Sequence, residues 1–234
     1  MLGRVLLHDL LTRRATTNGT DPFVTWYGLD PQGSSARTEL SVRSFANWVA
    51  KTANLLTDEL GLEPGERVEL RLNHDYPGHW MTLIWTMAAW QAGLTVTDGP
   101  GDVVVTGPTP GTAPKVPGYA CSLHPLGIGL RDLPPGWADF STEVLAQPDD
   151  WFGPGPDSPD DLAWDSAERS CTLGELMTLP SSAGRVLLTN PTSAWDVAQH
   201  CLVAPLLGGG STVITTDVDE TATARIAQDE KVSP

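Results

Sequence analysis

Apolar positions along the chain recur at two different spacings. Between residues 42 and 60 they fall three and four residues apart, at Phe45, Val49, Ala53, Leu56 and Leu60, which places them on one face of a helix. Ser41 is a suitable N-cap residue, and Gly61 is placed to end the helix. This pattern predicts a helix over residues 42–60.

Segments of the two kinds follow one another along most of the chain. Alternating or short apolar runs predict strands over residues 23–28, 37–41, 67–72, 94–98, 101–107, 185–190 and 211–217. Helical spacing predicts helices over residues 1–14, 42–60, 76–93, 137–147, 171–179, 193–207 and 219–231. The order predicts an α/β fold of layered, mostly parallel sheets with helices on both faces.

The Pro- and Gly-rich middle of the chain shows no clear period. Residues 108–136 cannot be assigned, and residues 148–161 have the acidic, Pro- and Gly-rich composition of a surface loop. One domain over residues 1–234 is favoured. An arrangement of two lobes, 1–107 and 162–234, joined by the middle region stays open.

Three tryptophans fall on the predicted helix over residues 76–93. Trp80, Trp85 and Trp90 are five residues apart, so they cannot share one helical face. We expect some of them to contact elements on different sides of this helix, with core packing favoured over an exposed partner surface.

Composition narrows the classes of partner. The 234 residues include 29 Asp and Glu against 14 Lys and Arg, a net charge of -15. This charge repels phosphate backbones and anionic lipid surfaces, so we expect no nucleic-acid or membrane partner. It does not exclude a small nucleotide in a local pocket. No apolar run reaches the ~20 residues of a membrane span.

Cysteine usage and the N-terminus favour a reducing compartment. The three cysteines are far apart, and none has the spacing of a zinc site. Charged residues interrupt the apolar stretch of residues 1–14, which is typical of an amphipathic helix rather than a signal peptide. We therefore expect a cytoplasmic protein without a metal site.

Two blocks of sequence resemble a known enzyme family. Residues 39–96 contain Leu60-Gly61, Pro64-Gly65-Glu66-Arg67-Val68, Asn73 and Ala92-Gly93. Residues 185–214 contain Arg185, Val186, Leu187, Pro191, Pro205, Leu206, Leu207, Gly209 and Val213. The order and spacing are similar to those in the N-terminal part of AMP-binding (adenylate-forming, acyl-CoA-synthetase-like) enzymes. This resemblance implies their fold and, as cofactor candidates, ATP/AMP or CoA.

The resemblance fails where that family binds phosphate. Its Gly/Ser/Thr-rich loop, of the form (T/S)SGTTGxPKG, should lie between residue 150 and the second block. The chain has LAWDSAERSCTLGELMTLPSSAG at residues 162–184, without the loop's glycines or its PKG tail. The segment from Thr106 to Gly118 contains a similar fragment with Lys115, but it comes too early, and Pro108 and Pro110 remove amides. A connector is favoured there, and Lys115 stays a ligand-binding candidate.

Further family features are altered. The aromatic-His pair that should follow Pro191 is replaced by a run ending in Trp195. Trp195 could stack on a base, although a packing role is favoured. The chain ends at Pro234, before the family's ribose-binding Asp, hinge and catalytic Lys. The resemblance therefore implies no catalytic residue here, and whether the chain is an enzyme stays open, with a non-enzyme favoured.

Two histidines are the remaining candidates. His74 and His79 flank a turn at the end of a predicted strand, where α/β sheets place ligands. Capping of the next helix by Asp75 is the favoured structural explanation of this cluster. Both histidines are kept as ligand-binding candidates, without the spacing of a metal site.

Three classes of function remain. The favoured one is a non-adenylating relative that acts as a binding or regulatory scaffold. The second is a residual ATP/AMP-, CoA- or acyl-binding protein, or a half-enzyme completed by a partner. The third is a structural interaction protein. Apolar surface that a longer relative would cover predicts a homodimer or another protein partner.

Overall fold

The computed structural model describes residues 5–232, so residues 1–4 of the first predicted helix lie outside it. The strands are β1 (Pro22–Leu29), β2 (Ser35–Ser41), β3 (Arg67–Leu70), β4 (Thr95–Thr97), β5 (Val103–Thr106), β6 (Gly118–Ala120), β7 (Ala138–Asp139), β8 (Leu162–Asp165), β9 (Ser170–Thr172), β10 (Arg185–Thr189) and β11 (Ser211–Thr215). The helices are α1 (Leu7–Thr17), α2 (Val42–Asn54), α3 (Leu72–Asp75), α4 (Trp80–Gln91), α5 (Phe140–Leu145), α6 (Leu173–Leu176), α7 (Ala194–Val197), α8 (Ala204–Gly208) and α9 (Glu220–Asp229), with π-helical turns η1 (Leu55–Glu59) and η2 (Ala198–Val203).

The smaller sheet joins the two ends of the chain. Its strand order is β10-β11-β1-β2. Strand β11 lies parallel to both β1 and β10, whereas β1 and β2 form an antiparallel hairpin. Because three of the four strands are parallel, β1, β10 and β11 all end at the same edge.

The larger sheet has the order β7-β6-β5-β3-β4-β8-β9. Its neighbouring strands are parallel except for the β8–β9 hairpin at one edge. In β3, Val68 and Leu70 are buried and alternate with the partly exposed Arg67 and Glu69, so one face of the sheet meets the core. The predicted α/β fold of mostly parallel sheets is confirmed.

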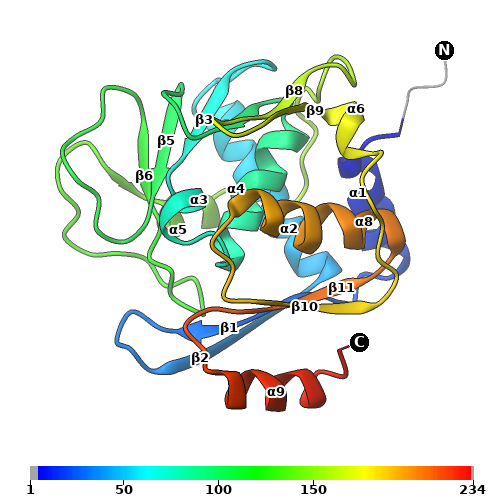
Figure 1. Cartoon of the computed structure of the whole chain (residues 1–234). Coiled ribbons are helices and arrows are strands. Elements are labelled where there is room, and N and C mark those ends of the chain that lie inside the picture. The colour runs from blue at the N-terminus through cyan, green and yellow to red at the C-terminus, as the bar shows by residue number, and fades with distance from the viewer. Residues whose placement is uncertain (1–4, 233–234) are drawn as a thin grey trace.

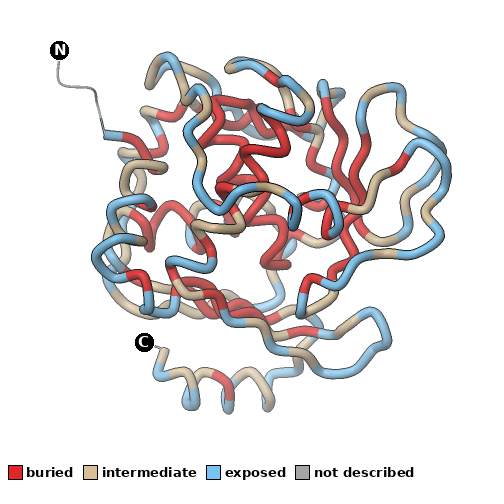
Figure 2. The backbone as a smooth tube through the Cα atoms, turned by 180° about the vertical axis from the view of Figure 1, so that it is seen from behind, coloured by how far each residue is buried: buried red, intermediate tan, exposed pale blue. Residues whose placement is uncertain are grey.

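Helices lie between the two sheets and on the far side of the smaller one. Figure 1 shows α2, α4 and α8 between the sheets, and α9 beneath the smaller sheet. All twelve residues of α4 are buried, because the helix is apolar on every side and has protein on every side. Figure 2 shows this buried centre as continuous through both sheets and the helices between them.

The three tryptophans of α4 reach different neighbours. The Trp80 ring lies 5.5 Å from that of Trp48 on α2. The Trp85 ring lies 4.7 Å from Phe140 on α5, and Trp90 Nε1 donates a 2.8 Å hydrogen bond to a backbone oxygen of β8. The expectation that these residues contact several elements is confirmed, and all three belong to the core.

An ionic cluster attaches α9 to the smaller sheet. Glu230, just after α9, accepts hydrogen bonds from Tyr27, Arg37 and Arg185. Partial burial alone raises the pKa of Glu230, but the hydrogen bonds from Tyr27, Arg185 and Arg37 outweigh it and lower the pKa to about 2. The carboxylate is therefore charged at neutral pH and holds α9 against β1, β2 and β10.

Several boundaries differ from those predicted. Helix α1 continues to Thr17 instead of ending at residue 14. The helix predicted over residues 76–93 begins at Trp80, because Pro77 and Gly78 form a turn. His79, rather than Asp75, caps α4: its Nδ1 accepts a hydrogen bond from the Met81 amide. Within residues 5–232, no helix is both long and apolar enough to cross a membrane.

Candidate functional site

A cleft of about 750 Å³ lies where strands of both sheets end. Its lining follows the carboxyl ends of β1, β10 and β11 in the smaller sheet and of β3, β5 and β6 in the larger one. The lining residues are Trp26, Leu29, Asp30, Pro31, Asp75, Tyr76, Pro77, Gly78, His79, Pro108, Leu123, Asn190, Pro191, Thr192, Thr216, Asp217, Val218 and Asp219. The carboxyl ends of parallel strands are where α/β proteins generally bind ligands.

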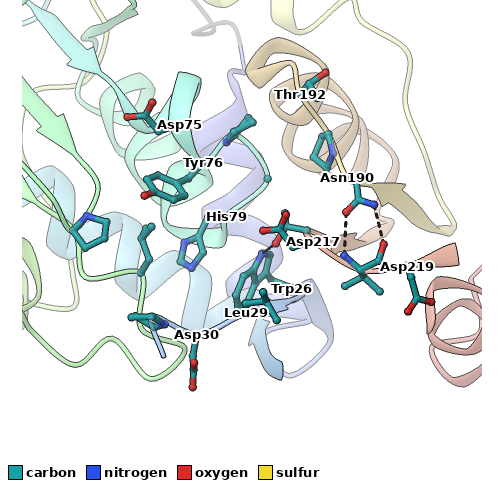
Figure 3. Close-up of a pocket in the computed structure, with 18 residues that line it drawn as sticks. Trp26, Leu29, Asp30, Asp75, Tyr76, His79, Asn190, Thr192, Asp217 and Asp219 are labelled. Carbon is teal, nitrogen blue, oxygen red and sulfur yellow. Dashed lines mark hydrogen bonds between the residues drawn. The ribbon is translucent and has the colours of Figure 1, made fainter. Parts of the chain in front are cut away.

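The inner wall of the cleft is aromatic. Trp26 packs edge-on against His79 with their ring centroids 4.7 Å apart, and its Nε1 donates a 3.0 Å hydrogen bond to Thr216 Oγ1. Both side chains are buried. Figure 3 shows His79 among the lining side chains, beside Trp26. The wall therefore presents a rigid apolar surface.

Gly78 allows the two halves of the cleft to approach closely. A Cβ atom there would lie 2.8 Å from Pro191 Cγ and 2.8 Å from Thr216 Cγ2. Such distances are too short for real contacts, so a larger residue would push the turn before α4 away from the ends of β10 and β11. Glycine is the residue that permits this approach.

His79 is buried and neutral. Burial lowers its pKa to about 3, with the backbone of Leu123 acting weakly in the opposite direction. Nδ1 accepts the hydrogen bond from Met81, so the ring proton is on Nε2. The Leu123 backbone lies near enough to the ring to raise its pKa, but within residues 5–232 no acceptor meets Nε2–H in full hydrogen-bond geometry. Leaving a buried donor unpaired is costly, so a ligand acceptor at Nε2 would stabilise the site.

The charged side chains of the lining all carry the same sign. Asp30, Asp75, Asp217 and Asp219 line the cleft, and no Lys or Arg of the described chain does so. Asn190 joins the loop after β10 to the loop after β11, which carries Asp217 and Asp219. Its side chain donates to the Val218 carbonyl at 2.9 Å and accepts from the Val218 amide, as the dashed lines in Figure 3 show.

The structure brings one of the four candidate residues into the cleft. His79 lines it, whereas His74, whose side chain is 93 % exposed, lies outside the lining and pairs with the lining residue Asp75. Trp195 packs against Trp164 at 5.5 Å and under the Arg169 guanidinium. Lys115 is exposed in the loop before β6. These three residues do not form a site together.

The segment expected to hold the phosphate loop, residues 162–184, forms the β8–β9 hairpin, helix α6 and the loop before β10. Ser166–Arg169 join β8 to β9. The Ser166 amide donates to the Arg169 carbonyl, the Ala167 amide to Asp98, and the Arg169 amide to Ser166 Oγ. These backbone donors already have protein acceptors and do not form a cradle for an anion.

The described chain has no group of three His, Cys, Asp or Glu residues placed to hold a metal ion. Its three cysteines are buried, and burial raises the pKa of each thiol. They are therefore inert thiols at neutral pH.

No protein-family model matches the sequence. A TIGR03089 family protein of Mycobacterium tuberculosis is 32 % identical over 229 residues, which cover 91 % of this chain and 90 % of that protein. This chain belongs to the TIGR03089 family.

The fold of this family member is shared with larger enzymes. A Brucella canis acyl-CoA synthetase matches with a TM-score of 0.71 and 17 % identity, over 100 % of this chain and 48 % of the other. Acetoacetyl-CoA synthetase from Streptomyces lividans matches with a TM-score of 0.70 and 16 % identity, over 97 % and 41 % of the two chains. The chain thus spans about half the length of these enzymes and matches their N-terminal half.

Sequence reasoning missed most of the cleft in this TIGR03089 family member. Trp26, Leu123 and Asp217 come from three strands or strand ends far apart in the sequence. A signal was available for two of them, because Trp26 and Asp217 lie near the ends of predicted strands, whereas Leu123 falls in the unassigned residues 108–136. Without the strand order, that signal cannot show which ends meet.

Proposed function

We propose that this chain is a small-molecule-binding protein without adenylation chemistry, with a binding or regulatory role. The observation that carries the proposal is the combination of an open cleft at the strand ends with a compact hairpin and short helix, β8, β9 and α6, in the segment where the phosphate loop was expected. The cleft volume of about 750 Å³ lies in the range of ligand sites in proteins.

The β8–β9 turn supports the absence of adenylation. A phosphate loop binds anions through free backbone amides that point into one concavity. In this turn the amides of Ser166, Ala167 and Arg169 bond to the protein itself. Binding a triphosphate there would require breaking those bonds and rebuilding the turn.

The charges of the cleft also disfavour nucleotides. ATP and CoA carry several negative charges, and the lining of the cleft has four carboxylates and, among the described residues, no Lys or Arg. The whole chain adds a net charge of -15. Like charges repel within about 8–10 Å at ordinary ionic strength, so a polyanion would bind weakly unless the site contributed cations.

Thermal unfolding with a nucleotide panel tests this proposal. We expect MgATP, AMP and CoA at millimolar concentration to leave the unfolding midpoint unchanged relative to matched MgCl₂ and NaCl. A ligand at ~100 times its Kd adds ~2.7 kcal/mol of stability, which shifts the midpoint of a chain this size by about 2–4 °C. A shift of that size with MgATP or CoA would overturn the proposal.

A further inference from the structure

We infer that the cleft at the ends of β1, β3, β10 and β11 binds an organic cation with an apolar body, such as an alkylammonium or arylalkylammonium ion, in preference to a carboxylate or a nucleotide. The inference rests on the proposed ligand-binding function and specifies the chemical class of its ligand. Three independent features of the cleft support it: its charge, its aromatic wall and its buried unpaired donor.

The charge is concentrated at the mouth. Asp217 is exposed and, within residues 5–232, receives no hydrogen bond at its carboxylate. Asp75 is exposed beside His74, and Asp30 is bonded to the amides of its own turn. Figure 3 shows these carboxylates around His79. An ammonium ion at the mouth would meet carboxylates without a competing Lys or Arg in the lining.

Three helix N-termini near the cleft favour anions and therefore oppose the attraction of a cation. That of α7 is capped by Ser193, whose Oγ accepts from the Asp196 amide, and those of α4 and α9 are capped by side chains of the lining. Asp219 accepts from the Ala222 amide at the start of α9, and His79 accepts from the Met81 amide at the start of α4. The cap on α9 is itself a carboxylate, so the positive end of that helix is offset.

The wall suits the apolar part of such a ligand. Trp26 and Leu123 are 2 % and 7 % exposed, and Tyr76 is half-buried. Aromatic faces attract cations, and Tyr76 is the lining ring with exposed surface, whereas Trp26 is buried as part of the apolar wall. An ammonium ion can therefore contact a ring and a carboxylate at once while its chain displaces water from the apolar wall.

His79 is the second indication of a ligand. The residue is 4 % exposed, and its Nε2–H has no partner among the described residues. Since burial holds the ring neutral, it adds no positive charge that would attract a carboxylate. Its proton suits a neutral acceptor, such as an ether or carbonyl oxygen on the body of the ligand.

A set of eight-carbon probes separates the classes, because only the head group differs. Calorimetric titration of octylammonium, 1-octanol and octanoate in 20 mM salt should give the lowest Kd for octylammonium, at least about tenfold below that of octanoate. Raising the salt to 300 mM should shrink this ratio, since screening weakens the head-group attraction.

Two matched variants test the role of the rim. Asp217 has a φ of 58°, a conformation that Asn also tolerates, so Asp217→Asn removes the charge without straining the backbone. It should raise the Kd of octylammonium about fivefold and leave that of octanol unchanged. Asp157→Asn is the control, because it makes the same charge change away from the cleft. Asp157 follows Pro156, which packs on Gly93 beyond the C-terminal end of α4, whereas the cleft lies at the N-terminal end of that helix. It should leave all three Kd values unchanged.

Each contrary result has a distinct meaning. Octanoate binding as tightly as octylammonium would overturn the cation inference and leave the proposed binding function standing. Octylammonium binding that survives Val218→Trp, which fills the cleft, would place the ion elsewhere on the acidic surface and overturn the inference. If none of the three probes binds the native chain, the inference is wrong, whereas the proposed function is tested separately by the nucleotide panel.

Discussion

Replacing Trp90 by Ala should lower the free energy of unfolding by about 4 kcal/mol. Trp90 is 1 % exposed and lies in the middle layer of the fold. Its loss leaves a large cavity and also removes the donor to the buried Ala163 carbonyl, which costs more than the lost contact alone. Guanidinium unfolding followed by circular dichroism measures the difference.

Phe152→Ala is the matched control for this substitution. Phe152 is 93 % exposed, so truncating its side chain should change the free energy of unfolding by no more than about 0.5 kcal/mol. A cost below about 1 kcal/mol for Trp90→Ala would contradict the position of α4 between the two sheets.

Acid should destabilise the protein through His79. Its pKa is lowered to about 3 in the fold, whereas an unfolded His titrates near ~6.5. Between these two values the unfolded chain binds more protons than the folded one, so stability is complete above about pH 6.5 and falls as the pH drops. From pH 7 to pH 5 we expect His79 to account for a loss of about 2 kcal/mol.

The His79→Asn variant removes this titration and retains a residue that can cap α4. Its unfolding free energy should therefore fall by about 2 kcal/mol less than that of the native chain between pH 7 and pH 5. His74→Asn, at a side chain that is 93 % exposed, should keep the native slope. Equal slopes for the native chain and His79→Asn would show that His79 is not held neutral by burial.

Most of the layered fold could be predicted because its elements have strong local patterns. The hairpin of β1 and β2, helix α2 with its Ser41 cap and strands β10 and β11 lie close to their expected positions. The π-helical turns could not be predicted, since the same apolar residues suit either hydrogen-bonding pattern. Leu55 and Leu56 are buried in the π-turn as they would be in an α-helix.

The strands in the middle of the chain could not be predicted from the sequence, because they are short. Strand β6 has three residues and follows a Pro-rich loop, and β8 and β9 have four and three. Such short segments carry no measurable period, and they are ordered by their neighbours in the larger sheet. A helix also contributes: the Trp164 ring of β8 packs on Trp195 of α7, which lies thirty-one positions further along the sequence.

In the candidate site, too, residues with a local sequence signal could be predicted and residues placed by the strand order could not. His79 could be predicted because it lies just after a strand and before a helix, a local signal. Trp26, Leu123 and Asp217 belong to the cleft only because β1, β6 and β11 end close together, which is a property of the strand order. Trp195 and Lys115 carry suitable chemistry, but they lie elsewhere in the structure.

Pyrophosphate exchange tests the central claim, the absence of adenylation, most directly. The protein is incubated with ATP, Mg²⁺, labelled pyrophosphate and octanoate, and the label entering ATP is counted. We predict no exchange above that of the heat-inactivated protein, because three of the four amides of the β8–β9 turn bond to the protein itself and the cleft lining is acidic. Exchange that requires octanoate and rises in proportion to the protein concentration would contradict this account.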